Sequence, residues 1–255
     1  MLEPSNGVFF FFLGPWFPQR LSLPKRGSNV SYQIFADHVT TGRVALVSNP
    51  KNHWFVFCAG CETRRECVGI TETVEVQARV HQCRYATNGG PFGGPTCITP
   101  VISNNTIMSD LVLTEGYQCI AMTRDSGDWL LGNISRALYP TISNLFCGFN
   151  WLVVNNSVLT YNDTEIAPRT AFGVDALGRM ISLVAEGSEV AHTGLTLNQT
   201  AVWMSQLGAK YAINLDGGGS STSWWHANGG VQGCPTCMDE PFCCLRSVTT
   251  INCLY

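Results

Sequence analysis

One stretch of the sequence combines a carboxylate, three glycines and two hydroxyl groups, in the order Asp216-Gly217-Gly218-Gly219-Ser220-Ser221. Glycines let backbone N–H groups approach a ligand closely, because no Cβ atom stands in the way. Such a loop favours anions, phosphate above all, and its carboxylate can take part in acid–base chemistry. The alternative is a tight turn capped by Asp216, since Gly and Asp are among the commonest turn residues.

Two familiar site motifs are missing from the sequence. It contains no G-x-x-x-x-G-K-[ST] pattern, which excludes a P-loop. It also contains no G-x-S-x-G pattern, so Ser220 and Ser221 are poor candidates for a hydrolase nucleophile. Their hydroxyl groups are better suited to donating hydrogen bonds to a ligand.

The segments before this loop predict how Asp216 is positioned. Thr196–Leu207 is predicted as a helix, because apolar residues recur at helical spacing and Gly208 suits a helix end. Tyr211–Leu215 is a short apolar run, typical of a strand inside a sheet. Such a strand would hold Asp216 rigidly at its carboxyl end, directly before the glycines.

Short strands dominate the rest of the chain, and one further helix is predicted at Thr71–His81, with Thr71 as its cap. Together these elements predict an α+β fold of mixed or antiparallel sheets with a few packing helices. The predicted strands are Gln33–Phe35, Arg43–Val47 and His53–Phe57, followed by the hairpins Trp151–Val154 with Val158–Tyr161 and Thr170–Val174 with Arg179–Ala185.

Length and composition favour a single domain over residues 28–255, since 255 residues with 45% hydrophobic composition can bury one substantial core. Residues 1–27 are predicted to be a poorly structured lead-in, either incomplete or derived from a signal sequence. No stretch reaches the roughly 18–20 apolar residues that span a bilayer, so we expect no transmembrane segment.

The charge balance argues against some classes of partner. A net charge of −3 with only 13% charged residues disfavours nucleic-acid binding and polybasic membrane binding. The five histidines show no metal-ligand spacing, and we predict neither a metal site nor a cofactor. His192 and His226 flank the glycine-rich loop and remain candidates for substrate contact.

Cysteines and glycosylation sequons place the chain in the secretory pathway. The 12 cysteines predict a disulfide-stapled fold, and six N-x-[ST] sequons occur in the same chain. Cys58-x-x-Cys61 and Cys234-x-x-Cys237 also have the spacing of zinc ligands, which leaves structural zinc as the alternative.

Several motifs resemble those of the phosphodiester glycosidase family. The resemblance covers roughly residues 43–255 and is most specific in the last 105 or so. Two positions depart from the family pattern, because Pro91 stands where Phe is usual and Glu186 where Asp is usual. The matching motifs are Asn88-Gly89-Gly90, Arg169–Asp175, Ala185-Glu186-Gly187, Gly194–Leu197, Leu207–Ala209 and Asn214–Thr222.

The resemblance implies hydrolysis of a sugar-1-phosphate diester, removing N-acetylglucosamine from N-acetylglucosamine-1-phospho-6-mannose to expose mannose 6-phosphate. The phosphate leaves as an anion, so stabilisation of its charge matters more than a general acid. Asp216 and Glu186 would be the two carboxylates, one of them nucleophile or base, and Arg169 would grip the phosphate. The expected substrate-binding residues are Asn88, Gly89, Gly217, Gly218, Gly219, Ser220 and Ser221.

Each assignment has a plainer alternative. Arg169 also fits a strand-end salt bridge, Glu186 a surface charge at the end of a hairpin, and Asn88 an Asn-Gly turn. The expected partner is a phosphorylated N-glycan or another sugar phosphodiester. The alternatives for the whole chain are therefore a hydrolase of a different sugar phosphodiester and a secreted module that binds phosphoglycans without cleaving them.

Overall fold

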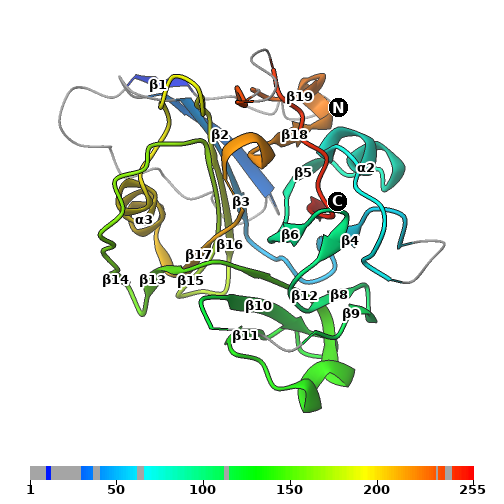
Figure 1. Ribbon diagram of the computed structural model, residues 1–255. Coiled ribbons are helices and arrows are strands. Elements are labelled where there is room, and N and C mark those ends of the chain that lie inside the picture. The colour runs from blue at the N-terminus through cyan, green and yellow to red at the C-terminus, as the bar shows by residue number, and fades with distance from the viewer. Residues whose placement is uncertain are drawn as a thin grey trace, which may run out of the picture.

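The computed structural model describes residues 10–12, 30–36, 41–61, 66–111, 115–233, 235–238 and 243–255 (Figure 1). Its framework is an eight-stranded sheet and two five-stranded sheets. Neighbouring strands run antiparallel in all three, except that the first two strands of the large sheet are parallel. The predicted α+β fold with mostly antiparallel sheets is therefore confirmed.

The large sheet has the strand order β1-β2-β3-β16-β15-β17-β13-β14. Its centre is the hairpin of β15 and β16, flanked by β3 on one side and β17 on the other. The bounds are Phe10–Phe12 for β1, Val30–Ala36 for β2, Thr41–Val47 for β3, Trp151–Val154 for β13, Ser157–Val158 for β14, Arg169–Asp175 for β15, Met180–Ala185 for β16 and Ala209–Asn214 for β17.

The second and third sheets have the orders β11-β10-β12-β8-β9 and β19-β18-β5-β20-β4, and β6 pairs with β7 in a small hairpin. In the second sheet the bounds are Val101–Ser103 for β8, Thr106–Ser109 for β9, Gln118–Thr123 for β10, Trp129–Gly132 for β11 and Ile142–Gly148 for β12. In the third sheet and the small hairpin they are Trp54–Cys58 for β4, Tyr85–Asn88 for β5, Phe92–Gly93 for β6, Thr96–Cys97 for β7, Ser223–Trp225 for β18, Gly230–Val231 for β19 and Thr250–Leu254 for β20.

The three sheets meet around one aromatic cluster. Trp54 of β4, Phe146 of β12 and Phe172 of β15 come one from each sheet and are almost completely buried. The ring centroid of Phe172 lies 5.0 Å from that of Phe146 and 5.4 Å from that of Trp54. Burying such large side chains is strongly favourable, and their edge-on and tilted contacts add to it. This shared core fixes the sheets relative to one another.

Two α-helices in the described part of the chain, α2 and α3, cover different sheets, and Figure 1 shows them on opposite sides of the molecule. The helix α3, Leu197–Gln206, packs against the large sheet and begins with a capping box formed by Thr196 and Gln199. The helix α2, Val74–Val80, packs against the third sheet. The described ranges also contain three short 3-10 helices, at Arg136–Thr141 (η1), Gly218–Ser220 (η2) and His226–Asn228 (η3).

The start of α2 differs from its predicted position. Thr73 caps the helix by accepting a hydrogen bond from the N–H of Val76 at 3.2 Å, whereas Thr71 was expected in that role. The reason is tertiary, because Glu72 forms an isolated β-bridge with Val248 and is held in extended conformation. Both predicted hairpins and the helix after Thr196 are confirmed, except that the second strand of the first hairpin is Ser157–Val158 and not Val158–Tyr161.

Disulfides link distant parts of the described chain. The pairs are Cys58–Cys61, Cys67–Cys97, Cys83–Cys253, Cys119–Cys147 and Cys237–Cys244, and Cys243 is disulfide-bonded as well. Cys58 and Cys61 therefore bond to each other, and the zinc alternative for this pair is wrong. Cys234 of the second Cys-x-x-Cys pair lies outside the described residues.

Two sequence predictions concern the start of the chain and its relation to membranes. Within the predicted lead-in, Phe10–Phe12 forms β1, and the remainder of residues 1–27 lies outside the described ranges. Across the described part of the chain, no helix has the length and apolar character needed to cross a bilayer.

Candidate active site

A pocket of about 520 Å³ opens where β15 begins and β17 ends. Ala171 of β15 pairs with Asn214 of β17, and the ladder continues with a hydrogen bond of 2.9 Å from the N–H of Leu215 to the carbonyl of Thr170. Because the two strands are antiparallel, the first residue of β15 lies beside the residues that follow β17. The polar and glycine residues of the pocket wall include Glu165, Arg169, Glu189, His192, Asp216, Gly217 and Gly218.

Asp216 places a buried carboxyl group in the pocket wall. Its Oδ2 atom is shielded from solvent and has no hydrogen-bond partner. Burial raises the pKa of Asp216 to about 7, although a hydrogen bond from Ser220 and the charge of Arg246 act in the opposite direction. A carboxyl group with this pKa exchanges its proton near neutral pH, which suits a general acid or base.

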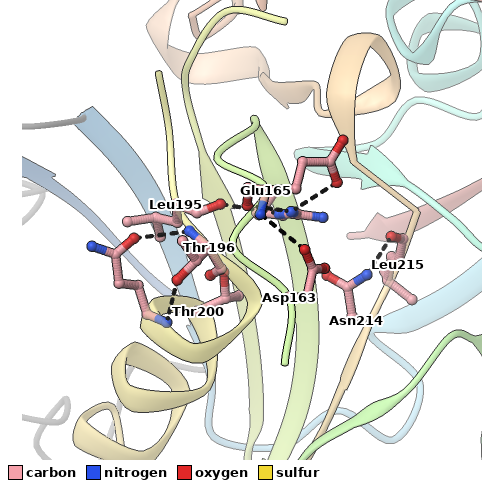
Figure 2. Close-up of polar contacts among 9 residues, drawn as sticks. Asp163, Glu165, Leu195, Thr196, Thr200, Asn214 and Leu215 are labelled. Carbon is pink, nitrogen blue, oxygen red and sulfur yellow. Dashed lines mark hydrogen bonds and ion pairs between the residues drawn. The ribbon is translucent and has the colours of Figure 1, made fainter. Parts of the chain in front are cut away.

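Arg169 lies in the pocket wall, as a phosphate-binding cation would, and it also forms the strand-end salt bridge that was the alternative. Its Nε atom donates to the carbonyl of Leu195 at 3.1 Å, and Nη2 donates to the carbonyl and the carboxylate of Glu165 at 2.9 and 3.2 Å. Figure 2 shows Leu195 and Glu165 in this cluster. Nη1 lies beside the glycine loop, since a Cβ atom at Gly217 would be 3.7 Å away. Arg169 thus forms a strand-end ion pair and still lines the pocket.

The glycine loop differs from the predicted open cradle of N–H groups. Residues 218–220 form the short helix η2, which directs the N–H groups of Ser220 and Ser221 to the carbonyls of Gly217 and Gly218 at 3.2 and 3.0 Å. The N–H of Gly218 donates to Pro168 at 2.8 Å. In this conformation, four successive N–H groups from Gly218 to Ser221 donate within the protein. Binding of a ligand by these N–H groups stays a prediction, and it requires them to exchange their present acceptors for the ligand.

The N–H of Gly219, the second of these four groups, donates to a carboxylate that the sequence analysis did not single out. Gly219 donates to Oε1 of Glu189 at 2.9 Å. Oε2 of Glu189 accepts from the N–H of Met238 at 3.1 Å and from Arg246 at 3.4 Å. Glu189 lines the pocket, whereas Arg246 is not among its lining residues. The one sequence signal for Glu189 was its place in the loop between β16 and α3.

Glu186, the second predicted carboxylate, is not among the residues that line the pocket. Its carboxylate forms an ion pair with Arg43 of β3 at 2.7 Å, and its N–H donates to the carbonyl of Thr41 at 2.8 Å. Burial raises the pKa of Glu186, and Arg43 opposes that shift. The structure therefore associates Glu186 with the neighbouring strand and does not bring it together with Asp216 in the pocket.

Asn88 and Gly89 also lie outside the pocket. The Asn88 side chain is fully buried, donates to the carbonyl of Asp216 and accepts from the Thr170 hydroxyl at 2.8 Å. Gly89 packs so closely on Thr250 that an added Cβ atom would lie 2.9 Å from the Thr250 Cβ. In the structure Asn88 therefore contacts residues of the site, and a contact of either residue with the sugar stays a prediction.

The two serines of the loop are buried too. Ser220 and Ser221 are each 2% exposed and are not among the residues that line the pocket, and the Ser220 side chain hydrogen-bonds Asp216. Gly217 and Gly218 do line it, in agreement with their predicted place. Among the described residues, no cluster of three or more His, Cys, Asp or Glu side chains is arranged to hold a metal ion.

Comparison with known proteins gives relatives for both the sequence and the fold. N-acetylglucosamine-1-phosphodiester alpha-N-acetylglucosaminidase from Homo sapiens is 28% identical over 252 residues, covering 87% of this chain and 47% of the human protein. The protein of the same name from Bos taurus is 29% identical over 257 residues, covering 89% and 46%. The chain thus spans about half the length of the curated relatives it matches.

Solved structures support the same architecture. The catalytic domain of zebrafish N-acetylglucosamine-1-phosphodiester alpha-N-acetylglucosaminidase, auto-inhibited by its pro-peptide, superposes with a TM-score of 0.77 at 23% identity, covering 93% of this chain and 87% of that one. A hypothetical protein from Synechocystis gives a TM-score of 0.62 at 14% identity, covering 89% and 64%. The model of the family described as phosphodiester glycosidase matches residues 81–254, which include the strands and loops that build the pocket. On this match, the chain belongs to the phosphodiester glycosidase family.

Proposed function

We propose that the protein hydrolyses a sugar-1-phosphate diester, and that its substrate is N-acetylglucosamine-1-phospho-6-mannose. The observation that carries the proposal is the buried carboxyl group of Asp216, with a pKa of about 7, in the same pocket wall as Arg169. Membership of the family and the names of the human and bovine relatives support the choice of substrate.

The proposed reaction needs few protein groups. The bond between the anomeric carbon and the phosphate oxygen breaks, and its electron pair leaves with the phosphate as a phosphomonoester on mannose. Water adds to the anomeric carbon, and its proton passes to the Asp216 carboxylate and then to solvent. Arg169 Nη1 would face the departing phosphate, where a fixed cation stabilises developing negative charge.

The cellular setting follows from the same features. Disulfides persist in oxidising compartments, and the described chain contains five assigned pairs. Together with six N-glycosylation sequons, they support a place in the secretory pathway, whether Golgi lumen, lysosome or cell exterior. Phosphorylated N-glycans of other glycoproteins would be available there as substrates.

The test compares the unmodified protein with Asp216→Asn, both produced in a secretory host, on N-acetylglucosamine-1-phospho-6-mannose. Loss of the base is expected to lower kcat by about 10²–10⁴-fold, as for other general bases, while the substrate still binds. Asp128→Asn is the matched control, because Asp128 is exposed and hydrogen-bonds only near its own turn.

Three results would contradict the proposal in different ways. Release of N-acetylglucosamine that Asp216→Asn leaves unchanged removes Asp216 from the chemistry. Turnover of another sugar phosphodiester, with none of this substrate, overturns the choice of substrate. Binding of the diester without any hydrolysis by the folded, unmodified protein indicates a phosphoglycan-binding module.

A further inference from the structure

The loop after β16 carries a carboxylate that donors from three separate segments hold in place. Gly219 lies in η2, Met238 follows a cysteine of the tail, and Arg246 precedes β20. All three donate to Glu189, which fixes both of its oxygen atoms. A side chain so restrained loses most of its rotamer freedom in the free protein, which is the condition for a preorganised catalytic group.

The surroundings of Glu189 are adapted to its presence. Gly218 has a φ of +56°, and a Cβ atom there would collide with Oε1 of Glu189. The side chain of Glu189 is 19% exposed, and the residue forms part of the pocket wall. Arg246 forms an ion pair with Glu189, and its charge also acts to lower the pKa of Asp216. Glu189 and Asp216 therefore line the same pocket, together with Gly217 and Gly218.

We propose that Glu189, and not Glu186, is the second carboxylate of the reaction, facing the anomeric carbon. This inference rests on the proposed function. The transition state of glycosyl transfer resembles an oxocarbenium ion, and a fixed negative charge beside it lowers its free energy. Glu189 supplies that charge and keeps its own bonds throughout, while Asp216 takes the proton from water. The phosphate carries away the electron pair of the broken bond.

The two carboxylates of the same loop differ in what they face. Glu186 pairs with Arg43 at 2.7 Å, outside the pocket. Three residues later the chain has turned, and Ser188 forms a bridge with Thr193 that closes the loop. This turn places Glu189 in the pocket wall. The match of Glu186 to an aspartate of the family gives no sign of this placement.

The test measures kcat and KM of Glu189→Gln, Glu186→Gln and Glu75→Gln on the diester. Glutamine keeps an oxygen for the N–H of Gly219 and removes the negative charge. We expect kcat of Glu189→Gln to fall by about 100-fold or more, with KM within about threefold, because an interaction specific to the transition state is lost. Glu75 is the matched control, since it is also paired with an arginine, Arg79, on the surface of α2.

A second measurement separates a catalytic carboxylate from a merely structural one. Glu189→Ala leaves space beside the anomeric carbon that a small anion can enter. With sodium azide this variant should form N-acetylglucosaminyl azide, detected by mass spectrometry, whereas Glu75→Ala should not. A structural role for Glu189 gives no such product.

Each outcome decides the inference. A fall in kcat for Glu189→Gln together with the azide product supports it. Unchanged kcat in Glu189→Gln, or a loss without azide product from Glu189→Ala, overturns it and leaves the proposed function intact if the unmodified protein is active. Loss of turnover in Glu186→Gln with Glu189→Gln active reverses the assignment. No turnover by the folded, unmodified protein overturns both proposals.

Discussion

The Asp216 carboxyl group couples the proposed chemistry to the stability of the fold. Its pKa rises from 3.8 to about 7, chiefly because burial disfavours the charged form. Above pH 7 the folded protein therefore carries a charge that the unfolded chain solvates better. Three pKa units at about 1.4 kcal/mol each correspond to roughly 4 kcal/mol of lost stability.

The sign of this coupling can be tested with Asp216→Asn. Below about pH 4 the carboxyl group is protonated in both states, and the substitution should change the free energy of unfolding little. As the pH rises from about 4 to 7, the unfolded state ionises first and the unmodified protein loses stability. We therefore expect Asp216→Asn to be the more stable form at pH 8, by up to about 4 kcal/mol in urea unfolding.

The same group should shape the pH dependence of turnover. A base with a pKa of about 7 is active only when deprotonated, so kcat/KM of the unmodified protein should rise through about pH 7 and then level off. A profile that is flat between pH 5 and 8, or a stability difference that does not grow over this range, would contradict the assigned pKa.

At the same scale, sequence reasoning found part of the site. Asp216 and Arg169 could be predicted because a strand end and a glycine loop have local signals. The choice between Glu186 and Glu189 could not be predicted, because it depends on where a loop turns after β16. The acceptors of the loop N–H groups could not be predicted either, because Glu189 and Pro168 contact these groups only in the folded chain.

Among the elements, those with strong local signals were predicted well. The helix α3 has a capping box and a clear apolar face, and the hairpin of β15 and β16 has its turn residues in place. The start of α2 was predicted at Thr71, whereas Thr73 caps the helix in the structure. The bridge between Glu72 and Val248, more than 170 residues apart, decided between them.

One buried side chain ties the elements of the site together, and it provides the next prediction. Asn88, at the end of β5, bonds the carbonyl of Asp216, the hydroxyl of Thr170 at 2.8 Å and the N–H of Thr222 at 3.3 Å. Asn88→Ala leaves these groups without that partner, at about 1–3 kcal/mol each. We expect the free energy of unfolding to fall by about 3 kcal/mol or more, with a lower kcat as the loop shifts.

The comparison with Asn228→Ala, on the exposed helix η3, controls for the loss of an amide. If Asn88 instead contacted the sugar, its substitution would raise KM and leave the unfolding midpoint unchanged. That result would restore the role expected from the sequence and contradict the supporting one.

At the scale of the whole molecule, sequence patterns could not predict how the three sheets pack against one another. Alternating apolar residues predict that a strand has a buried face, but not which sheet will cover it. Trp54 and Phe172 lie in separate predicted strands and Phe146 lies in no predicted strand, and only the fold brings their rings within 6 Å of one another. The cysteine count correctly predicted disulfide bonds, but the pairing of the cysteines could be read only from the structure.

The disulfides allow a test at this scale, because they close loops of very different length. Cys83–Cys253 joins the end of the α2 region to β20 across 170 residues, whereas Cys237–Cys244 spans 7. By loop-closure entropy the first should contribute about 5 kcal/mol and the second about 2 kcal/mol. The Cys237–Cys244 disulfide instead packs on the glycine-rich loop, since Cys244 Sγ approaches the carbonyl of Gly219 at 3.9 Å.

We therefore expect Cys83→Ala/Cys253→Ala to lower the unfolding midpoint much more than Cys237→Ala/Cys244→Ala does. Cys237→Ala/Cys244→Ala should chiefly lower kcat, because the support of η2 is lost. Equal losses of stability in the two double variants, measured by urea unfolding with the other disulfides intact, would contradict this division between holding the sheets and holding the site.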